Sequence, residues 1–151
     1  MTPAEFDFPA WAQAALAESS CEGFLDVEDA SIHYITWGDA SNPPLVLIHG
    51  NAASAEWWRF IGPLLSDHYY VIAPDLPGMG DSAHTGKYER ERYAEQIMAV
   101  AAALAPKRKP FLVGHSLGGC VAILAGNAYA EQLAGIIVVD WPPCEPLLKD
   151  A

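Results

Sequence analysis

Residues 111–119 read FLVGHSLGG, an apolar run that stops at a Gly-His-Ser-Leu-Gly pentapeptide. The run predicts a strand, the pentapeptide a sharp turn, and residues 117–130 a helix of small and apolar side chains. A serine at the apex of such a turn has a strained backbone, so glycines must flank it to avoid clashes. Gly114 and Gly118 meet that need, and Ser116 is therefore a candidate nucleophile.

Two backbone donors are expected beside this serine. The N–H of Leu117 would lie at a helix N-terminus, where unpaired donors stabilise a negatively charged oxygen. Upstream, the apolar run 45–48 ends at His49, Gly50 and Asn51. In this type of turn the second donor comes from a His-Gly-containing loop after the third strand. We therefore expect Asn51 and Leu117 to form an oxyanion hole.

A third apolar run, residues 69–73, ends in the turn-rich loop PDLPGMGDS at residues 74–82. With these three segments in order, residues 23–140 resemble the serine α/β-hydrolase family, in its His-Gly, D-x-P-G-x-G-x-S and G-H-S-x-G-G motifs. The resemblance implies a hydrolase that acts on an ester or related small acyl substrate, with no metal and no organic cofactor. It also implies structural roles for His49 and for Asp75, whose carboxylate would hydrogen-bond its own loop.

The remaining pattern predicts an α/β fold with a mostly parallel sheet and an N-terminal antiparallel hairpin. Residues 24–27 and 31–37 flank a short polar turn and predict the hairpin. From residue 45 onward, apolar strands alternate with helical stretches, which is typical of βαβ units. The last expected strand is residues 135–139.

Three helices are expected outside the serine turn. One runs over residues 9–17, with Asp7 near its start, because Pro9 interrupts a capping-box pattern at residues 2–5. One begins at Ser54 and is disrupted by Gly62-Pro63. One is carried by apolar residues spaced over 93–104. We expect residues 1–22 to be a helical appendage and residues 23–151 a partial α/β-hydrolase domain.

The composition limits the kinds of partner that the protein is expected to bind and the compartment in which it is expected. The chain has 151 residues, 52% of them hydrophobic, and a net charge of -11, which repels nucleic acid and anionic lipid. No apolar stretch is long enough for a membrane span, and the start lacks a secretory pattern. The odd cysteine count (Cys21, Cys120 and Cys144) lacks metal-ligand spacing. We expect a cytoplasmic protein without nucleic-acid or membrane partners. The one basic cluster, residues 107–109, indicates a solvated loop.

The catalytic base is missing from the sequence. In this fold the chain order is serine, then an acid, then histidine. All five histidines precede Ser116; they are His33, His49, His68, His84 and His115. Members of the family carry further strands, and the histidine, after the position of Asp140. We therefore expect the N-terminal part of the fold, C-terminally truncated relative to the family.

The sequence leaves open which residues could act as the catalytic base and the catalytic acid. His115 adjoins the serine, but neighbouring side chains of a strand face opposite ways, so its ring is expected to point away from Ser116. His84 lies in a loop on the ligand-binding side of the sheet and is the plausible surrogate base. Asp140 is either the catalytic acid or a carboxylate that caps its loop. Trp57 and Trp58 are expected in the core or in a pocket wall.

Two consequences follow from the missing part. Loss of the histidine in a related triad costs roughly a millionfold in turnover, so the chain alone is expected to be weakly active or inactive. Residues 135–139 would form an apolar sheet edge, which predicts self-association. A non-catalytic binding or interaction module is the alternative function, and a degraded remnant is a third. Dehalogenation is disfavoured because related carbon–halogen hydrolases use aspartate at the position of Ser116.

Overall fold

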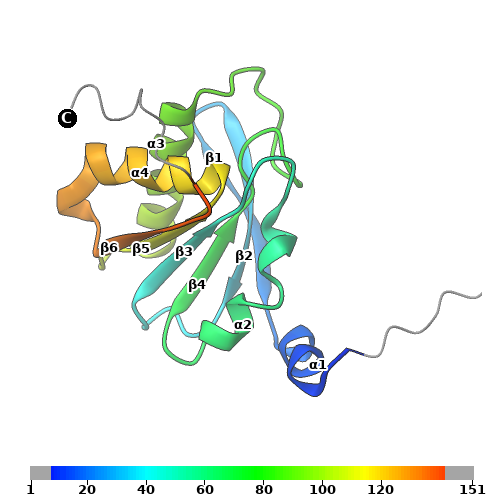
Figure 1. Ribbon diagram of the computed structural model, residues 1–151. Coiled ribbons are helices and arrows are strands. Elements are labelled where there is room, and N and C mark those ends of the chain that lie inside the picture. The colour runs from blue at the N-terminus through cyan, green and yellow to red at the C-terminus, as the bar shows by residue number, and fades with distance from the viewer. Residues whose placement is uncertain (1–7, 142–151) are drawn as a thin grey trace, which may run out of the picture.

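The computed structural model describes residues 8–141 and has the predicted α/β architecture, with one six-stranded sheet in the order β1-β2-β4-β3-β5-β6 (Figure 1). β1 and β2 form an antiparallel hairpin, β2 runs antiparallel to β4, and the other neighbours are parallel. The strands are β1 (Cys21–Val27), β2 (Ala30–Trp37), β3 (Pro44–Ile48), β4 (Tyr70–Pro74), β5 (Phe111–His115) and β6 (Gly135–Val139).

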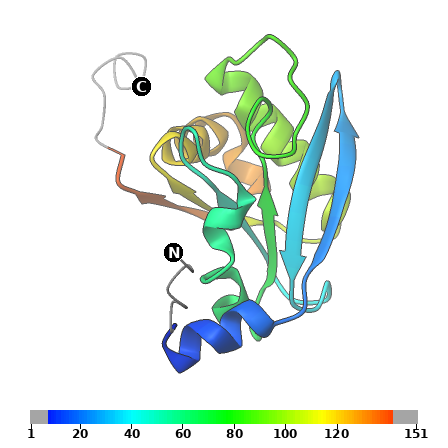
Figure 2. The same cartoon turned by 90° about the vertical axis from the view of Figure 1, so that its right-hand side faces the viewer.

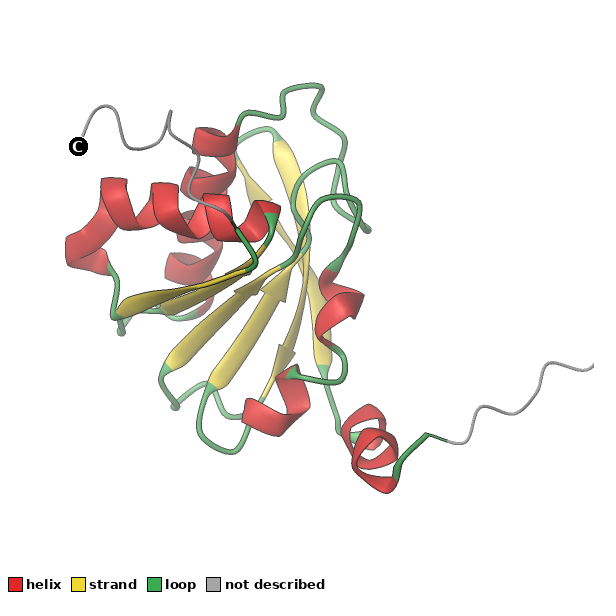
Figure 3. Cartoon of the chain, viewed as in Figure 1, coloured by secondary structure: helices red, strands yellow, loops and turns green. Residues whose placement is uncertain are grey.

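Helices lie on both faces of the sheet (Figures 2 and 3). The two long helices, α3 and α4, cover one face, and the short elements η1 and α2 cover the other. The helical elements are α1 (Ala10–Ala17), η1 (Ala55–Trp58), α2 (Gly62–Leu65), α3 (Arg90–Leu104), α4 (Leu117–Tyr129) and η2 (Ala130–Gln132). No helix within residues 8–141 is long and apolar enough to cross a bilayer.

The hairpin, the parallel strands and the helices after residue 90 confirm the expectations within a few residues. The helix expected from Ser54 is wrong in detail, because that stretch forms a 3-10 turn and a separate short helix. Gly62-Pro63 opens α2 instead of ending a helix, since proline suits the first helical turn, where its missing N–H has no partner to lose. The capping-box pattern at residues 2–5, Asp7 and Cys144 lie outside the described residues.

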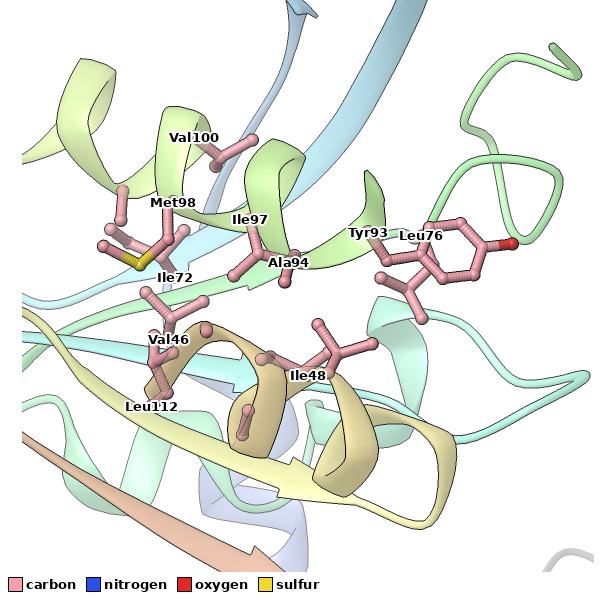
Figure 4. Close-up of a cluster of buried hydrophobic side chains, with 14 of the residues drawn as sticks. Val46, Ile48, Ile72, Leu76, Tyr93, Ala94, Ile97, Met98, Val100 and Leu112 are labelled. Atoms are coloured by element: carbon pink, nitrogen blue, oxygen red, sulfur yellow. The ribbon is translucent and has the colours of Figure 1, made fainter. Parts of the chain in front are cut away.

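The main core lies between the sheet and the two long helices. Val46, Ile48 and Ile72 project from the central strands toward Ile97 of α3, and all four are 1% exposed or less (Figure 4). These strand residues alternate with others that face η1 and α2, because successive side chains of a strand point to opposite faces. The core therefore holds the carboxyl ends of β3, β4 and β5 in a fixed register beneath the loops that follow them.

The outermost strand, β6, is unusually exposed for an apolar strand. Ile136, Ile137, Val138 and Val139 are 41%, 57%, 36% and 42% exposed. Aliphatic residues on both faces are typical of a strand buried inside a parallel sheet. In the described part of the chain, β6 pairs only with β5, so its other edge carries unpaired backbone groups.

Candidate active site

Ser116 lies at the turn between β5 and α4 with φ of 52° and ψ of -117°. A positive φ is rare for a residue with a side chain and marks local backbone strain. The Ser116 N–H donates to the carbonyl of Val139 in β6 (2.9 Å), and the Ser116 carbonyl accepts from the N–H groups of Gly119 and Cys120. The backbone of the serine is thus fixed by β6 on one side and by α4 on the other.

The two glycines that flank the serine have no room for a side chain. A Cβ at Gly114 would lie 2.0 Å from the carbonyl oxygen of Gly118, and one at Gly118 would lie 2.3 Å from the carbonyl oxygen of Ile48. Real Cβ atoms never approach backbone so closely. The Gly-x-Ser-x-Gly spacing is therefore a steric requirement of this turn, which the sequence pattern identified.

The loop after β3 packs directly against the start of α4. The added Cβ of Gly118 would also lie 2.7 Å from the carbonyl oxygen of His49, and a Cβ at Gly50 would lie 3.3 Å from the Cβ of Ser116. Asn51, the next residue, is exposed at this junction. Within residues 8–141 the Leu117 N–H donates no hydrogen bond, as expected for the first turn of a helix. Both candidate oxyanion donors thus belong to segments in contact beside the serine.

His49 is fully buried and hydrogen-bonded through both ring nitrogens. Nε2 accepts the N–H of Leu76 (3.0 Å), so the proton resides on Nδ1, which donates to the carbonyl of Gly50 (2.7 Å). The neutral ring therefore ties the loop after β3 to the loop after β4. Burial lowers the pKa of His49, and the Gly50 carbonyl and the Asp75 charge oppose that shift only in part.

This burial predicts a pH-dependent stability. The unfolded chain takes up a proton on His49 near pH 6.5 while the folded chain resists it, so stability is full above that pH and falls as the solution is acidified. We expect the free energy of unfolding to drop by about 1 kcal/mol between pH 6.5 and 5.5 from this group. Urea unfolding at both pH values measures it. His49→Gln should flatten this slope, whereas the exposed-site control His68→Gln should keep it; equal slopes in the two variants would contradict the assignment.

Asp75 anchors the loop after β4, as the resemblance implied. Its carboxylate, 2% exposed, accepts the N–H groups of Ala55 (2.5 Å) and Asp81 (2.9 Å). It also accepts the ring N–H of His33, a β2 residue 42 positions away (2.9 Å). The Ser82 hydroxyl extends the network: it donates to the backbone carbonyl of Asp75 and accepts the backbone N–H of His33. The sequence pattern did not reveal His33 as a partner, because only the β2–β4 pairing brings this residue to Asp75.

The same side chains form the one group in the described part of the chain with metal-like spacing. Ligand atoms of His33, Asp75 and Asp81 lie within 4.8 Å of one another. The Asp75 oxygens already accept three hydrogen bonds, one of them from His33 itself, so most of the lone pairs that a metal would need are in use. The cluster therefore suits loop anchoring better than metal binding.

His115 stacks on Trp57 of η1, with ring centroids 5.4 Å apart and planes 15° apart. Trp57 is 56% exposed and His115 is half-buried, so the pair lies along the surface beside the serine turn and outside the core. The sequence predicted that the His115 ring points away from Ser116; the ring lies between Trp57 and the loop after β3, where a Cβ added at Gly50 would be 3.0 Å from its Nδ1. Trp58, by contrast, is buried in the core on the η1 side of the sheet.

Neither the predicted acid, Asp140, nor the predicted surrogate base, His84, forms a hydrogen bond of a catalytic triad in residues 8–141. Asp140 is exposed, follows β6 with φ of 54°, and comes directly after the residue that binds the Ser116 N–H. His84 is exposed and its Nδ1 pairs with the hydroxyl of Tyr88 (3.1 Å). Within residues 8–141 the Ser116 hydroxyl has no hydrogen-bonded histidine.

Comparison with known proteins gives a consistent family assignment. Residues 45–150 match the family model described as "Alpha/beta hydrolase family". The chain is 36% identical over 114 residues to a pimeloyl-(acyl-carrier protein) methyl ester esterase of Aliivibrio fischeri, a match that covers 76% of this chain and 42% of that enzyme. It is 34% identical over 114 residues to a soluble epoxide hydrolase of Corynebacterium sp., covering 74% and 38%.

Among solved structures, the thioesterase domain from the curacin biosynthetic pathway superposes with a TM-score of 0.78 at 29% identity. The match covers 85% of this chain and 47% of that domain. The chain thus spans about two fifths of the length of the curated relatives it matches. Residues 45–150, which match the family model, include the serine turn and the loops after β3 and β4.

Proposed function

We propose, from the premise that this chain belongs to the α/β-hydrolase family, that it is the nucleophile-bearing part of a serine hydrolase acting on carboxylic esters or related acyl compounds. The observation that supports this most is the strained turn at Ser116, enclosed by two glycines that admit no side chain and in contact with the loop after β3. An esterase and a thioesterase among its relatives favour acyl transfer.

In the proposed reaction, the Oγ of Ser116 attacks the carbonyl carbon of the ester. The carbonyl oxygen then carries negative charge, which the N–H groups of Asn51 and Leu117 stabilise. Collapse of this intermediate expels the alcohol and leaves an acyl group on Ser116, which water removes in a second attack. Asp140 is the proposed acid. The base that completes such a triad is not among the residues after Ser116, so turnover by this chain alone is expected to be weak or absent.

Covalent labelling tests the nucleophile. Phenylmethylsulfonyl fluoride should modify the chain slowly and once, at Ser116, because an oxyanion hole accelerates attack even without a base. Intact-mass and peptide mass spectrometry measure the adduct and its position. The Ser116→Ala variant should show no adduct, and labelling that is equal in this variant would overturn the assignment.

A non-catalytic binding module is the alternative function. It is favoured by the absence of a histidine hydrogen-bonded to Ser116 in residues 8–141. Hydrolysis of 4-nitrophenyl acetate separates the two functions. Turnover above that of Ser116→Ala supports the hydrolase, whereas equal rates together with ligand binding support the module.

We also propose that β6 pairs with β6 of a second copy. Within residues 8–141 its outer edge has no partner strand, and its four exposed aliphatic side chains carry no charge to block edge-to-edge pairing. Sedimentation velocity should show a dimer whose fraction rises with concentration, and Ile137→Lys should shift it to monomer. Leu64→Lys, at a site 54% exposed on α2, is the matched control and should leave the dimer intact. A wild-type chain that stays monomeric at its highest soluble concentration would contradict this pairing.

A further inference from the structure

The loop between α3 and β5 carries three basic side chains that no carboxylate neutralises. Lys107, Arg108 and Lys109 are all exposed. Within residues 8–141 none of the three forms an ion pair, whereas Arg59 and Arg92 each bind two carboxylates. The protein as a whole has a net charge of -11, so this loop differs in sign from most of the surface. Its cations are available to an anion from outside the chain.

The backbone of this loop is fixed at both ends. The N–H of Arg108 donates to the carbonyl of Ala105 (3.3 Å), which closes a four-residue turn with Pro106 at its second position. The carbonyl of Pro110 accepts the N–H of Ala134 (2.9 Å) just before β6. An ordered loop loses little conformational entropy on binding. The charged groups are therefore attached to a preorganised backbone.

A hollow of about 340 Å³ opens between this loop, the end of α3 and η2. Its floor is apolar, since Met98 and Ala101 of α3 are 8% and 2% exposed and Met98 belongs to the main core (Figure 4). Its rim carries three positive charges from residues 107–109 and one negative charge from Glu131, a net charge of +2. An apolar floor with a few charged groups, in a volume of about 300–1,000 Å³, is typical of small-molecule sites.

A second hollow, on the other side of the same loop, suits a ligand less well. It has a volume of about 420 Å³ and shares residues 105–108 with the first. Its other lining residues are 40–42 and Leu104, and none of the residues that line it is buried. Lys109 lines only the first hollow. The first hollow therefore offers both more positive charge and more apolar surface out of water.

We propose that the hollow between the 105–110 loop and η2 binds a small organic anion, namely a carboxylate with an unbranched apolar chain. The carboxylate accepts hydrogen bonds from the basic side chains of residues 107–109, and the chain lies on Met98 and Ala101. The volume equals that of about eleven water molecules, and octanoate has ten non-hydrogen atoms. The site lies before the first residue of β5 and Ser116 follows the last, so the inference does not depend on the proposed acyl transfer.

The negative charge of the whole protein does not prevent this binding. At physiological ionic strength charges interact over about 8 Å, so an anion in the hollow responds mainly to the residues that line it. The carboxyl end of α3 adds partial negative charge there, which the loop cations offset. Without these cations, Glu131 and the helix end would repel an anion. The proposed affinity therefore depends directly on residues 107–109.

Methionine methyl resonances test the site. In the full chain labelled with ¹³C-methyl methionine, octanoate should shift the Met98 resonance saturably and leave that of Met79, in the loop after β4, unchanged. Octylammonium has the same chain and the opposite charge and should bind at least about tenfold more weakly. Acetate lacks six methylenes and should also bind at least about tenfold more weakly. An unmoved Met98 resonance, or equal affinities for octanoate and octylammonium, would overturn the proposal.

Charge reversal tests the rim of the hollow. Lys109→Glu should weaken octanoate binding by about fivefold or more, because an exposed ion pair contributes up to about fivefold and the variant adds repulsion. Lys87→Glu is the matched control, since Lys87 is exposed in the loop before α3 and the change in net charge is the same. This control should keep the wild-type affinity. Equal losses in the two variants would show a response to overall charge and contradict the site.

Filling the floor tests the position of the chain. Ala102→Leu should weaken octanoate binding by about fourfold for each ligand methylene that its side chain displaces. Ala103→Leu, at the next exposed position of the same helix and outside both hollows, should bind as the wild type does. Ser116→Ala should also keep the wild-type affinity, which separates this site from the proposed active site. Wild-type affinity in Ala102→Leu would place the ligand elsewhere.

Discussion

Replacing Gly114 by alanine is expected to abolish the folded state. The added Cβ would lie 2.0 Å from the carbonyl oxygen of Gly118, 2.3 Å from its carbonyl carbon and 2.6 Å from the nitrogen of Gly119. All three are backbone atoms of the first turn of α4, which β5 and the loop after β3 hold in place. Relief of the overlap requires α4 to leave the sheet, at a cost of about 4–5 kcal/mol or more. A domain of this kind has only about 5–15 kcal/mol of stability.

The expected result is a chain without a cooperative urea transition and with reduced helical circular dichroism. Gly135→Ala is the matched control, because a Cβ at that strand position meets the Phe111 ring at an ordinary 3.4 Å. That variant should unfold within about 0.5 kcal/mol of the wild type. A Gly114→Ala chain with the wild-type urea midpoint would show that the serine turn is not held as described.

Local sequence signals predicted the structure correctly at positions where a steric requirement allows only one type of residue. The Gly114 and Gly118 positions, the strand runs and the C-terminal end of α3 all follow from short-range chemistry, so the order of elements was predictable. The stretch after Ser54 was not, because 3-10 turns and one-turn helices have no periodicity of their own and depend on packing against the sheet. Trp58 and Ala55 supply that packing by entering the core of this face.

The site shows the same division between local and long-range information. The position of the loop at Gly50 beside the serine turn and the bond of Asp75 to its own loop were predicted from motifs, but the bond between Asp75 and His33 was not. His33 reaches Asp75 only because β2 pairs with β4, with Tyr34 opposite Pro74. The stacking of His115 on Trp57 likewise joins residues 58 positions apart in the chain. Contacts of this range depend on sheet order, which a single sequence does not encode in any short segment.

Asp75→Asn is expected to be the most damaging polar substitution in the described part of the chain. The buried carboxylate accepts hydrogen bonds from the N–H groups of Ala55 and Asp81 and from the ring of His33. An asparagine presents an NH₂ group where one oxygen stood, so at least one buried donor faces another donor and loses its partner. Leaving a buried donor without its partner costs about 1–3 kcal/mol, and more where the lost acceptor carried a charge. The loops after β3 and β4 should loosen together, because this carboxylate joins them.

Urea unfolding at neutral pH measures the loss, and Asp39→Asn is the matched control. Asp39 is exposed and accepts the N–H of Ser41 at 2.7 Å in a surface turn, so its substitution should cost no more than about 1 kcal/mol. The amide resonances of Ala55 and Asp81 report the site itself, and both should move strongly in Asp75→Asn and stay in place in Asp39→Asn. Equal stability of the two variants would show that solvent, and not the buried network, satisfies these donors. The loops around Ser116 would then need another anchor.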